Sequence, residues 1–255
     1  MILYKFDGSF TGLLCCVFES FQTKESQVRV VSDSFYRPNI FAGTKEIYSD
    51  EQKAERVWNS FVEKVNPEDK EKFYFSFLAE KPDIFQHLFF LARKVFIHGG
   101  AYAKNFADPD VLAVSQMAKS VNRERHRMKT FINFHKATNG LLYSVISPKY
   151  NVIPLLQPHF LVCNAHQNWL VYDEKRQYGI FYDLNEIHPV TKNVDEIESF
   201  LNNLRSETQL NDEKVESPEF LWKEYFLSSL LSAEKNKNFQ LINDSKRYVR
   251  YLHEN

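Results

Sequence analysis

The hydrophobic period of the sequence changes part-way along the chain, within residues 123–134. Before this stretch, apolar residues recur mostly at the three- and four-residue intervals of a helix. After it, short runs rich in β-branched and aromatic residues alternate with turn residues, a pattern that is typical of strands. The change predicts an α+β protein, in which a mainly helical part precedes a sheet.

The helical part contains five amphipathic patterns and two short strand candidates at residues 2–6 and 27–31. The predicted helices are residues 10–21, 50–65, a segment that starts at Pro67, residues 83–96, and a segment that follows Asp108 and Pro109 as far as Val121.

The second part predicts two hairpins that are separated by a helix. Strands are expected at residues 130–135 and 141–147 around the turn Asn139-Gly140, and a helix at residues 154–165. The second hairpin comprises residues 169–173 and 178–182. This strand-strand-helix-strand-strand order predicts an antiparallel sheet with a helix on one face.

Three parts are therefore expected: a helical part at residues 1–125, a sheet part at 126–190, and a helical C-terminal part at 191–255. We expect them to pack as one compact unit. The 255-residue length is sufficient for a substantial core.

Composition and the pattern of apolar residues exclude several classes of protein and of cofactor site. The formal net charge is −1, and the three cysteines include the adjacent pair Cys15 and Cys16, so no disulfide framework or iron–sulfur ligand set is expected. The start of the sequence lacks a signal-peptide pattern, and no apolar run has the length of a membrane span. We therefore expect a cytoplasmic protein that has no membrane segment, and no motif predicts a cofactor.

Positive charge is concentrated at the change of period. Five bases lie beside one acid, Glu124, and the bases are Lys119, Arg123, Arg125, Arg127 and Lys129. Local clusters of this kind bind phosphates, and arginine can donate two hydrogen bonds to one phosphate at once. On a helix, Arg125 and Lys129 would share a face, as would Arg123 and Arg127. The alternative is a solvated basic face, or arginines paired to the protein's own acids.

A second basic cluster lies near the end of the sequence, where Lys246, Arg247 and Tyr248 precede Arg250 and Tyr251. Interleaved bases and rings suit single-stranded nucleic acid, although a closing helix whose tyrosines pack on the core would have the same pattern. We expect the two clusters to meet in the fold. The predicted nucleic-acid-binding residues are Arg123, Arg125, His126, Arg127, Lys129, Lys246, Arg247 and Tyr248.

Four residues are candidates for acid–base chemistry, and they are His126, His159, Asp173 and Asp183. Asp173 and Asp183 each end a predicted strand, so we prefer the interpretation that they cap turns. His159, Cys163 and His166 would share one helix face, but no metal site is expected, because short His/Cys spacings are often coincidental.

Several segments resemble a bacterial family labelled "probable DNA metabolism protein", a domain of unknown function. The matching segments are residues 4–14, 125–129, 158–160, 169–173, 178–180, 182–183 and 246–248. Members of that family are encoded beside a radical-SAM protein similar to a photoproduct lyase, and some are fused to a uracil-DNA glycosylase domain. We expect no glycosylase domain within this sequence, which stops shortly after residues 246–248.

The resemblance implies a setting in DNA repair and leaves the chemistry open. The first hypothesis is a nucleic-acid-binding accessory protein that acts with a radical-SAM partner. The second is an enzyme that acts on a nucleobase or nucleotide, and the third is a protein–protein adaptor that does not bind DNA. Whether the protein is an enzyme stays open at the level of sequence.

Overall fold

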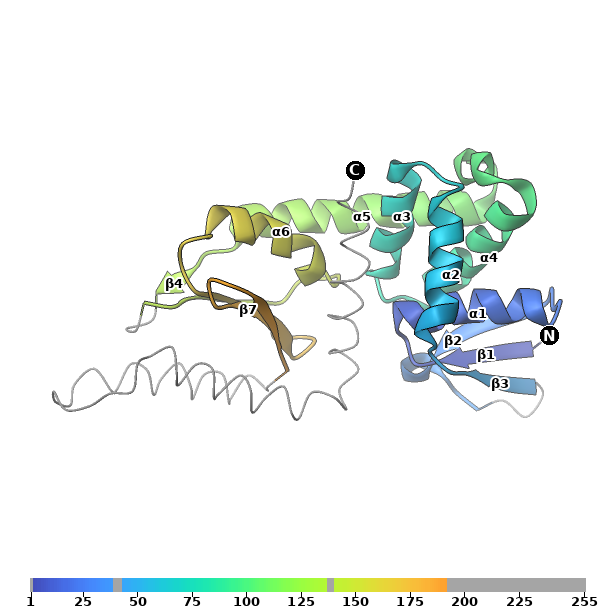
Figure 1. Cartoon of the computed structure of the whole chain (residues 1–255), viewed down its shortest axis with the longest axis horizontal. Helices are drawn as coiled ribbons and strands as arrows, with labels where there is room; N and C mark the ends of the chain where they lie inside the picture. Colours follow the sequence, from blue (N-terminus) through green and yellow to red (C-terminus); the bar gives the residue numbers. More distant parts are fainter. Residues whose placement is uncertain (1, 39–42, 137–139, 192–255) are drawn as a thin grey trace, which may run out of the picture. The chain divides into compact units, whose positions relative to one another are not determined.

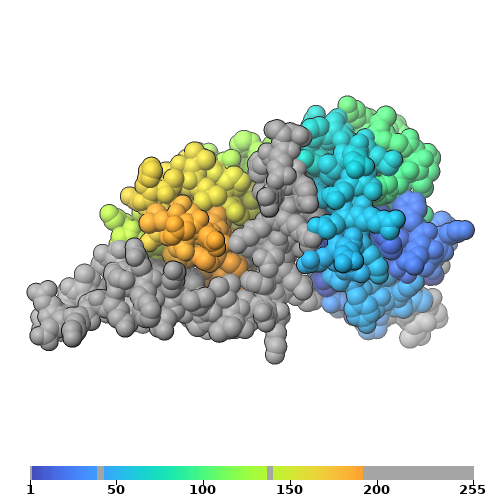
Figure 2. All heavy atoms as spheres, in the orientation of Figure 1, coloured from blue at the N-terminus to red at the C-terminus, as the bar shows by residue number. Residues whose placement is uncertain are grey.

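The computed structural model describes residues 2–38, 43–136 and 140–191 (Figure 1). They fall into two compact units, and the chain passes from the first to the second between Arg123 and Glu124, inside helix α5 (Pro109–Phe131). Figure 2 shows the described residues of both units as spheres. The predicted C-terminal helical part, with Lys246, Arg247 and Tyr248, lies outside the described residues.

The first unit contains a three-stranded parallel sheet with strand order β2-β1-β3. Both strand candidates of the helical part are confirmed, because they form its first two strands. The strands are β1 (Ile2–Phe6), β2 (Val28–Ser32) and β3 (Gly43–Ile47). Helix α1 lies along this sheet (Figure 1). Among the described residues of the unit, four α-helices precede α5. They are α1 (Phe10–Gln22), α2 (Glu51–Val62), α3 (Pro67–Phe77) and α4 (Pro82–His98).

An aromatic cluster around Phe10 forms the core of the first unit. The side chain of Phe10 is fully buried, and its ring centroid lies 5.2 Å from that of Trp58 and 4.9 Å from that of Phe77. Ser9 begins α1 by accepting a 2.8 Å hydrogen bond from the Gly12 N–H, as an N-cap residue does. The cap therefore places Phe10 at the start of the helix, where it faces α2 and α3.

The second unit contains a five-stranded mixed sheet whose spatial order follows the sequence. The strands are β4 (His135–Lys136), β5 (Leu142–Ile146), β6 (Trp169–Asp173), β7 (Tyr178–Tyr182) and β8 (Ile187–Val190). Helix α6 (Ile153–Cys163) connects β5 to β6 and packs on the sheet (Figure 1).

The predicted α+β class and the predicted antiparallel sheet are both wrong. Strands β5 and β6 are parallel, while the other three pairs are antiparallel. Helix α6 returns the chain to the end where β5 began, and a strand–helix–strand connection of this kind gives parallel neighbours. With a second, fully parallel sheet in the first unit, the arrangement is α/β-like.

The predicted strand at residues 130–135 is also wrong, because α5 continues to Phe131. Met128, Phe131 and Ile132 have helical spacing, and the Ile132 N–H still donates to the Met128 carbonyl at 3.0 Å. The basic residues at positions 125–129 therefore lie on the last turns of a helix, and β4 contains only His135 and Lys136.

Candidate nucleic-acid interface

The basic residues of the second unit, at positions 125–129, lie on α5, and their side chains differ in solvent exposure. His126 and Arg127 are exposed, whereas Arg125 and Lys129 are half-buried. Arg125 and Lys129 are one helical turn apart, so they share a face, as their spacing predicts. Arg123 is the last residue of the first unit, and its Nη2 donates to the Ser120 Oγ at 3.3 Å.

Arg127 is paired to an acid of the protein. Its Nη2 lies 2.6 Å from the Glu124 Oε1, which also accepts a 2.8 Å hydrogen bond from the Lys149 N–H. The Glu124 side chain is only 7% exposed, while that of Arg127 is 55% exposed. The pair balances the charge of Arg127 but leaves its guanidinium at the surface.

Lys129 lies in a positive environment. Burial lowers the pKa of its ammonium, and the Arg125 guanidinium lowers that pKa further. Burial also lowers the pKa of His159, on α6, and the charge of Lys129 adds to this effect. Within the part of the chain that the structure describes, no carboxylate is among the charges that shift either pKa.

The structure thus brings together residues that the sequence had placed in two separate candidate sites. The Sγ of Cys163 lies 3.7 Å from the His159 Nδ1, and Cys163 offsets a small part of the lowering of the Lys129 pKa. We call Arg125, Lys129 and His159 the cationic cluster. Holding the charges of Arg125 and Lys129 close together in a half-buried place costs free energy, as would protonating His159 beside them, and a bound anion would reduce both costs. Such a cluster suits a phosphate group.

The two predicted carboxylates cap turns, which confirms the preferred interpretation. Asp173 is fully buried, and its Oδ1 accepts a 3.2 Å hydrogen bond from the Arg176 N–H. The Asp183 Oδ1 accepts the Asn185 and Glu186 N–H groups at 2.9 and 2.7 Å. Burial raises the pKa of Asp183, but hydrogen bonds from Glu186, His188 and Asn185 outweigh burial and lower it overall.

The other two candidates for acid–base chemistry are both histidines of the second unit. His126 is exposed on α5, and His159 belongs to the cationic cluster. His166 lies beyond Cys163, the last residue of α6, so it does not extend the predicted His/Cys face. In the described ranges, no group of three or more ligating side chains could hold a metal ion.

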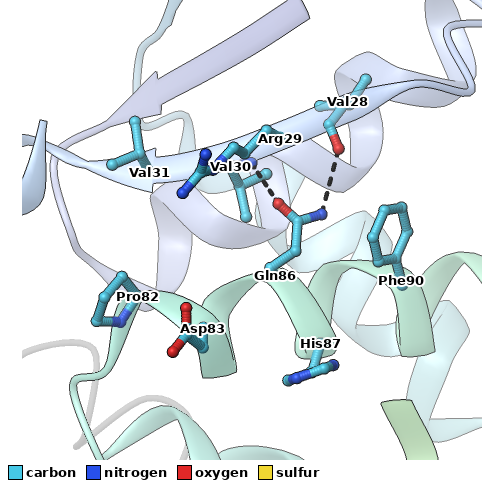
Figure 3. Close-up of a pocket in the computed structure, with 9 residues that line it drawn as sticks. All are labelled: Val28, Arg29, Val30, Val31, Pro82, Asp83, Gln86, His87 and Phe90. Carbon is cyan, nitrogen blue, oxygen red and sulfur yellow. Dashed lines mark hydrogen bonds between the residues drawn. The ribbon is translucent and has the colours of Figure 1, made fainter. Parts of the chain in front are cut away.

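A pocket in the first unit was not anticipated from the sequence (Figure 3). It has a volume of about 420 Å³ and lies between β2 and α4. Gln86 joins its two walls, because its side-chain amide accepts from the Val30 N–H at 2.8 Å and donates to the Val28 carbonyl at 3.2 Å. These bonds give partners to two backbone groups at the edge of β2, which has no neighbouring strand on that side among the described residues.

His87 lines this pocket, and its ring contacts the buried carboxylate of Asp110. The His87 Nδ1 lies 2.6 Å from the Asp110 Oδ1, and the Lys94 Nζ lies 2.5 Å from the Asp110 Oδ2. In the tautomer that donates from Nδ1 to this carboxylate, the His87 Nε2 carries the lone pair of the ring. Lys94 also contacts Asp108 at 2.6 Å.

Asp108 caps the start of α5, because its Oδ1 accepts the Asp110 N–H at 2.8 Å. Hydrogen bonds from Lys94, Tyr102 and the Asp110 backbone outweigh burial, which raises the pKa of Asp108, and lower that pKa to about 2. The anionic form of Asp108 thus holds Lys94 against Asp110.

A family model for a domain of unknown function, DUF4130, matches residues 82–254. The chain belongs to this family. No curated protein and no solved structure matches the sequence. The DUF4130 match includes α4, α5 and every described element of the second unit, so it contains the cationic cluster and one wall of the His87 pocket. In the described part of this DUF4130 protein, no helix is long and apolar enough to cross a membrane.

Proposed function

We propose that the protein is a nucleic-acid-binding accessory protein in bacterial DNA repair or metabolism. The observation that carries this proposal is the cationic cluster, in which Lys129 lies close enough to Arg125 and His159 for the Arg125 charge to lower its pKa and for its own charge to lower that of His159. The setting in DNA repair and the radical-SAM partner rest on the resemblance of the sequence to the DNA-metabolism family. The cluster supports the phosphate-binding part of the proposal.

Replacing Lys129 with glutamine is expected to weaken DNA binding several-fold. The slope of log affinity against log salt should become shallower by about 1, because one phosphate contact no longer releases a counterion. Fluorescence anisotropy with labelled DNA, over a series of salt concentrations, measures both quantities. Lys175→Gln is the matched control, since Lys175 is an exposed lysine in the turn between β6 and β7.

The thermal stability of Lys129→Gln separates a binding role from a structural one. A lysine whose folded-state pKa is lowered destabilises the fold wherever it is protonated, so the variant should melt no earlier than the wild type. Equal effects of Lys129→Gln and Lys175→Gln on DNA binding, or no DNA binding at low salt, would each refute the proposal. A stable complex with the radical-SAM partner but no DNA binding would instead favour an adaptor.

A second candidate function is an enzyme that acts on a nucleobase or nucleotide, with its active site in the His87 pocket. The His87–Asp110 pair favours it, because a histidine oriented by a carboxylate is a common general base. Arg29 and Asp83 also line the pocket, so a cation and an acceptor are present for a polar ligand.

Under this second function, His87→Gln is expected to lower the turnover of a converted nucleotide by about 10²- to 10⁴-fold, as loss of a general base does. Chromatography after incubation with a panel of nucleotides measures the conversion. His98→Gln is the control, because His98 is exposed at the end of α4. If no nucleotide is converted, or both variants behave alike, this function is excluded.

A further inference from the structure

A groove of about 560 Å³ runs beside the last turns of α5 in the second unit. Helix α5 contributes Met128 and Phe131, Ile132 directly follows the helix, and the strands β4 and β5 contribute the opposite side. Among the described residues that line the groove, none is acidic. An apolar or anionic partner would therefore meet no repulsion from a carboxylate of the described lining.

Aromatic rings from both sides border this groove. The side chain of Phe131 is 70% exposed, an unusual place for so large an apolar group. Opposite it, His135 pairs with Tyr143 across the β4–β5 ladder, and their ring centroids lie 5.6 Å apart. Flat apolar rings held at a surface suit a ligand that has flat apolar faces of its own.

Positive charge flanks the groove on the helix. Successive residues of an α-helix are rotated by about 100°, so Met128 and Phe131 share one face of α5, and Ile132 continues this face because its N–H still donates to the Met128 carbonyl. By the same rotation, Arg127 falls on one side of that face, and Lys129 and Arg125 fall on the other. Lys136 is exposed in β4, next to the groove residue His135.

We infer that the groove receives unstacked bases of a single-stranded nucleic acid, while Lys129 and Arg127 contact its phosphates. This inference rests on the proposed function and names the form of nucleic acid that it takes. In a duplex, both faces of each base are already stacked, so Phe131 would find no free face. In a single strand, each base that stacks on an aromatic side chain contributes about 1–3 kcal/mol.

The test compares a labelled oligothymidylate of twenty nucleotides with its duplex, by anisotropy at low salt. Phe131→Ala is expected to weaken binding of the single strand by about 5- to 100-fold and to change duplex binding less than twofold. Phe131→Trp should retain the affinity for the single strand, because it keeps a ring for stacking. Tyr48→Ala is the control, since Tyr48 is 77% exposed in the first unit.

The outcomes separate this inference from the proposed function. Selective loss of single-strand affinity in Phe131→Ala, with recovery in Phe131→Trp, supports the groove. If the wild type binds DNA through Lys129 but Phe131→Ala binds both forms normally, or loses both equally, the groove assignment is wrong and the proposed function stands. If the wild type binds neither form, the proposed function fails first.

Discussion

Replacing Arg176 with alanine is expected to destabilise the second unit by about 3–5 kcal/mol, the usual effect of removing one partner from a buried ion pair. The Arg176 Nη1 lies 2.8 Å from the Asp173 Oδ2, and the Asp173 side chain is 0% exposed. The same guanidinium donates to the Pro148 carbonyl at 3.2 Å and the Lys149 carbonyl at 3.3 Å. Without Arg176, a buried carboxylate loses this counter-charge and the hydrogen bond that accompanies it.

Urea denaturation followed by circular dichroism measures this loss, and hydrogen exchange of β6 and β7 shows where it occurs. Lys53→Ala is the control, because the Lys53–Asp50 pair is exposed, at 47% and 40%, and such pairs contribute about 0–1 kcal/mol. Removing both charges, in Asp173→Asn/Arg176→Leu, should cost less than Arg176→Ala alone, since the buried carboxylate is then removed together with the guanidinium. A loss below about 1 kcal/mol in Arg176→Ala would contradict the prediction.

The hairpin that contains Asp173 shows what local sequence determines. Strands β6 and β7 have the bounds that were predicted for them, Trp169–Asp173 and Tyr178–Tyr182. All their residues are buried, so polarity does not alternate along them. Their β-branched and aromatic composition, with turn residues between them, was a sufficient signal, because strand preference reflects side-chain shape. The Asp173 cap was predictable for the same local reason.

Sheet topology could not be predicted in the same way. Strand β3 has the sequence Gly-Thr-Lys-Glu-Ile, which contains three poor strand formers, yet it pairs with β1 along its full length. Its partner lies about forty residues earlier in the chain, so no local pattern marks the pairing. Strand β8 contains Pro189 and was missed, but it lies at the edge of the sheet, where proline is tolerated.

In the candidate interface, too, local features could be predicted from the sequence, and contacts between distant residues could not. The shared face of Arg125 and Lys129 follows from helix spacing, and the structure contains it. The meeting of Lys129 with His159 depends on how α5 and α6 pack, which the sequence does not show. The predicted meeting with Lys246, Arg247 and Tyr248 stays a prediction, because those residues lie outside the described part. His87 and Asp110 are 23 residues apart, and no pattern links them.

Replacing Phe10 with alanine is expected to cost the first unit about 3–5 kcal/mol, the usual loss for a fully buried aromatic side chain. The Phe10 ring contacts Trp58, Tyr74 and Phe77 at centroid distances of 5.2, 5.4 and 4.9 Å, so the substitution leaves a cavity where α1, α2 and α3 meet.

Urea denaturation gives the free energy of unfolding, and hydrogen exchange of β1 and α1 should report faster opening in Phe10→Ala. Phe35→Ala removes the same group from a side chain that is 44% exposed, and it should cost less than about 1 kcal/mol. The difference between the two variants isolates burial, because the chemistry of the substitution is the same. Equal losses in both variants would mean that the cluster around Phe10 does not hold the first unit together.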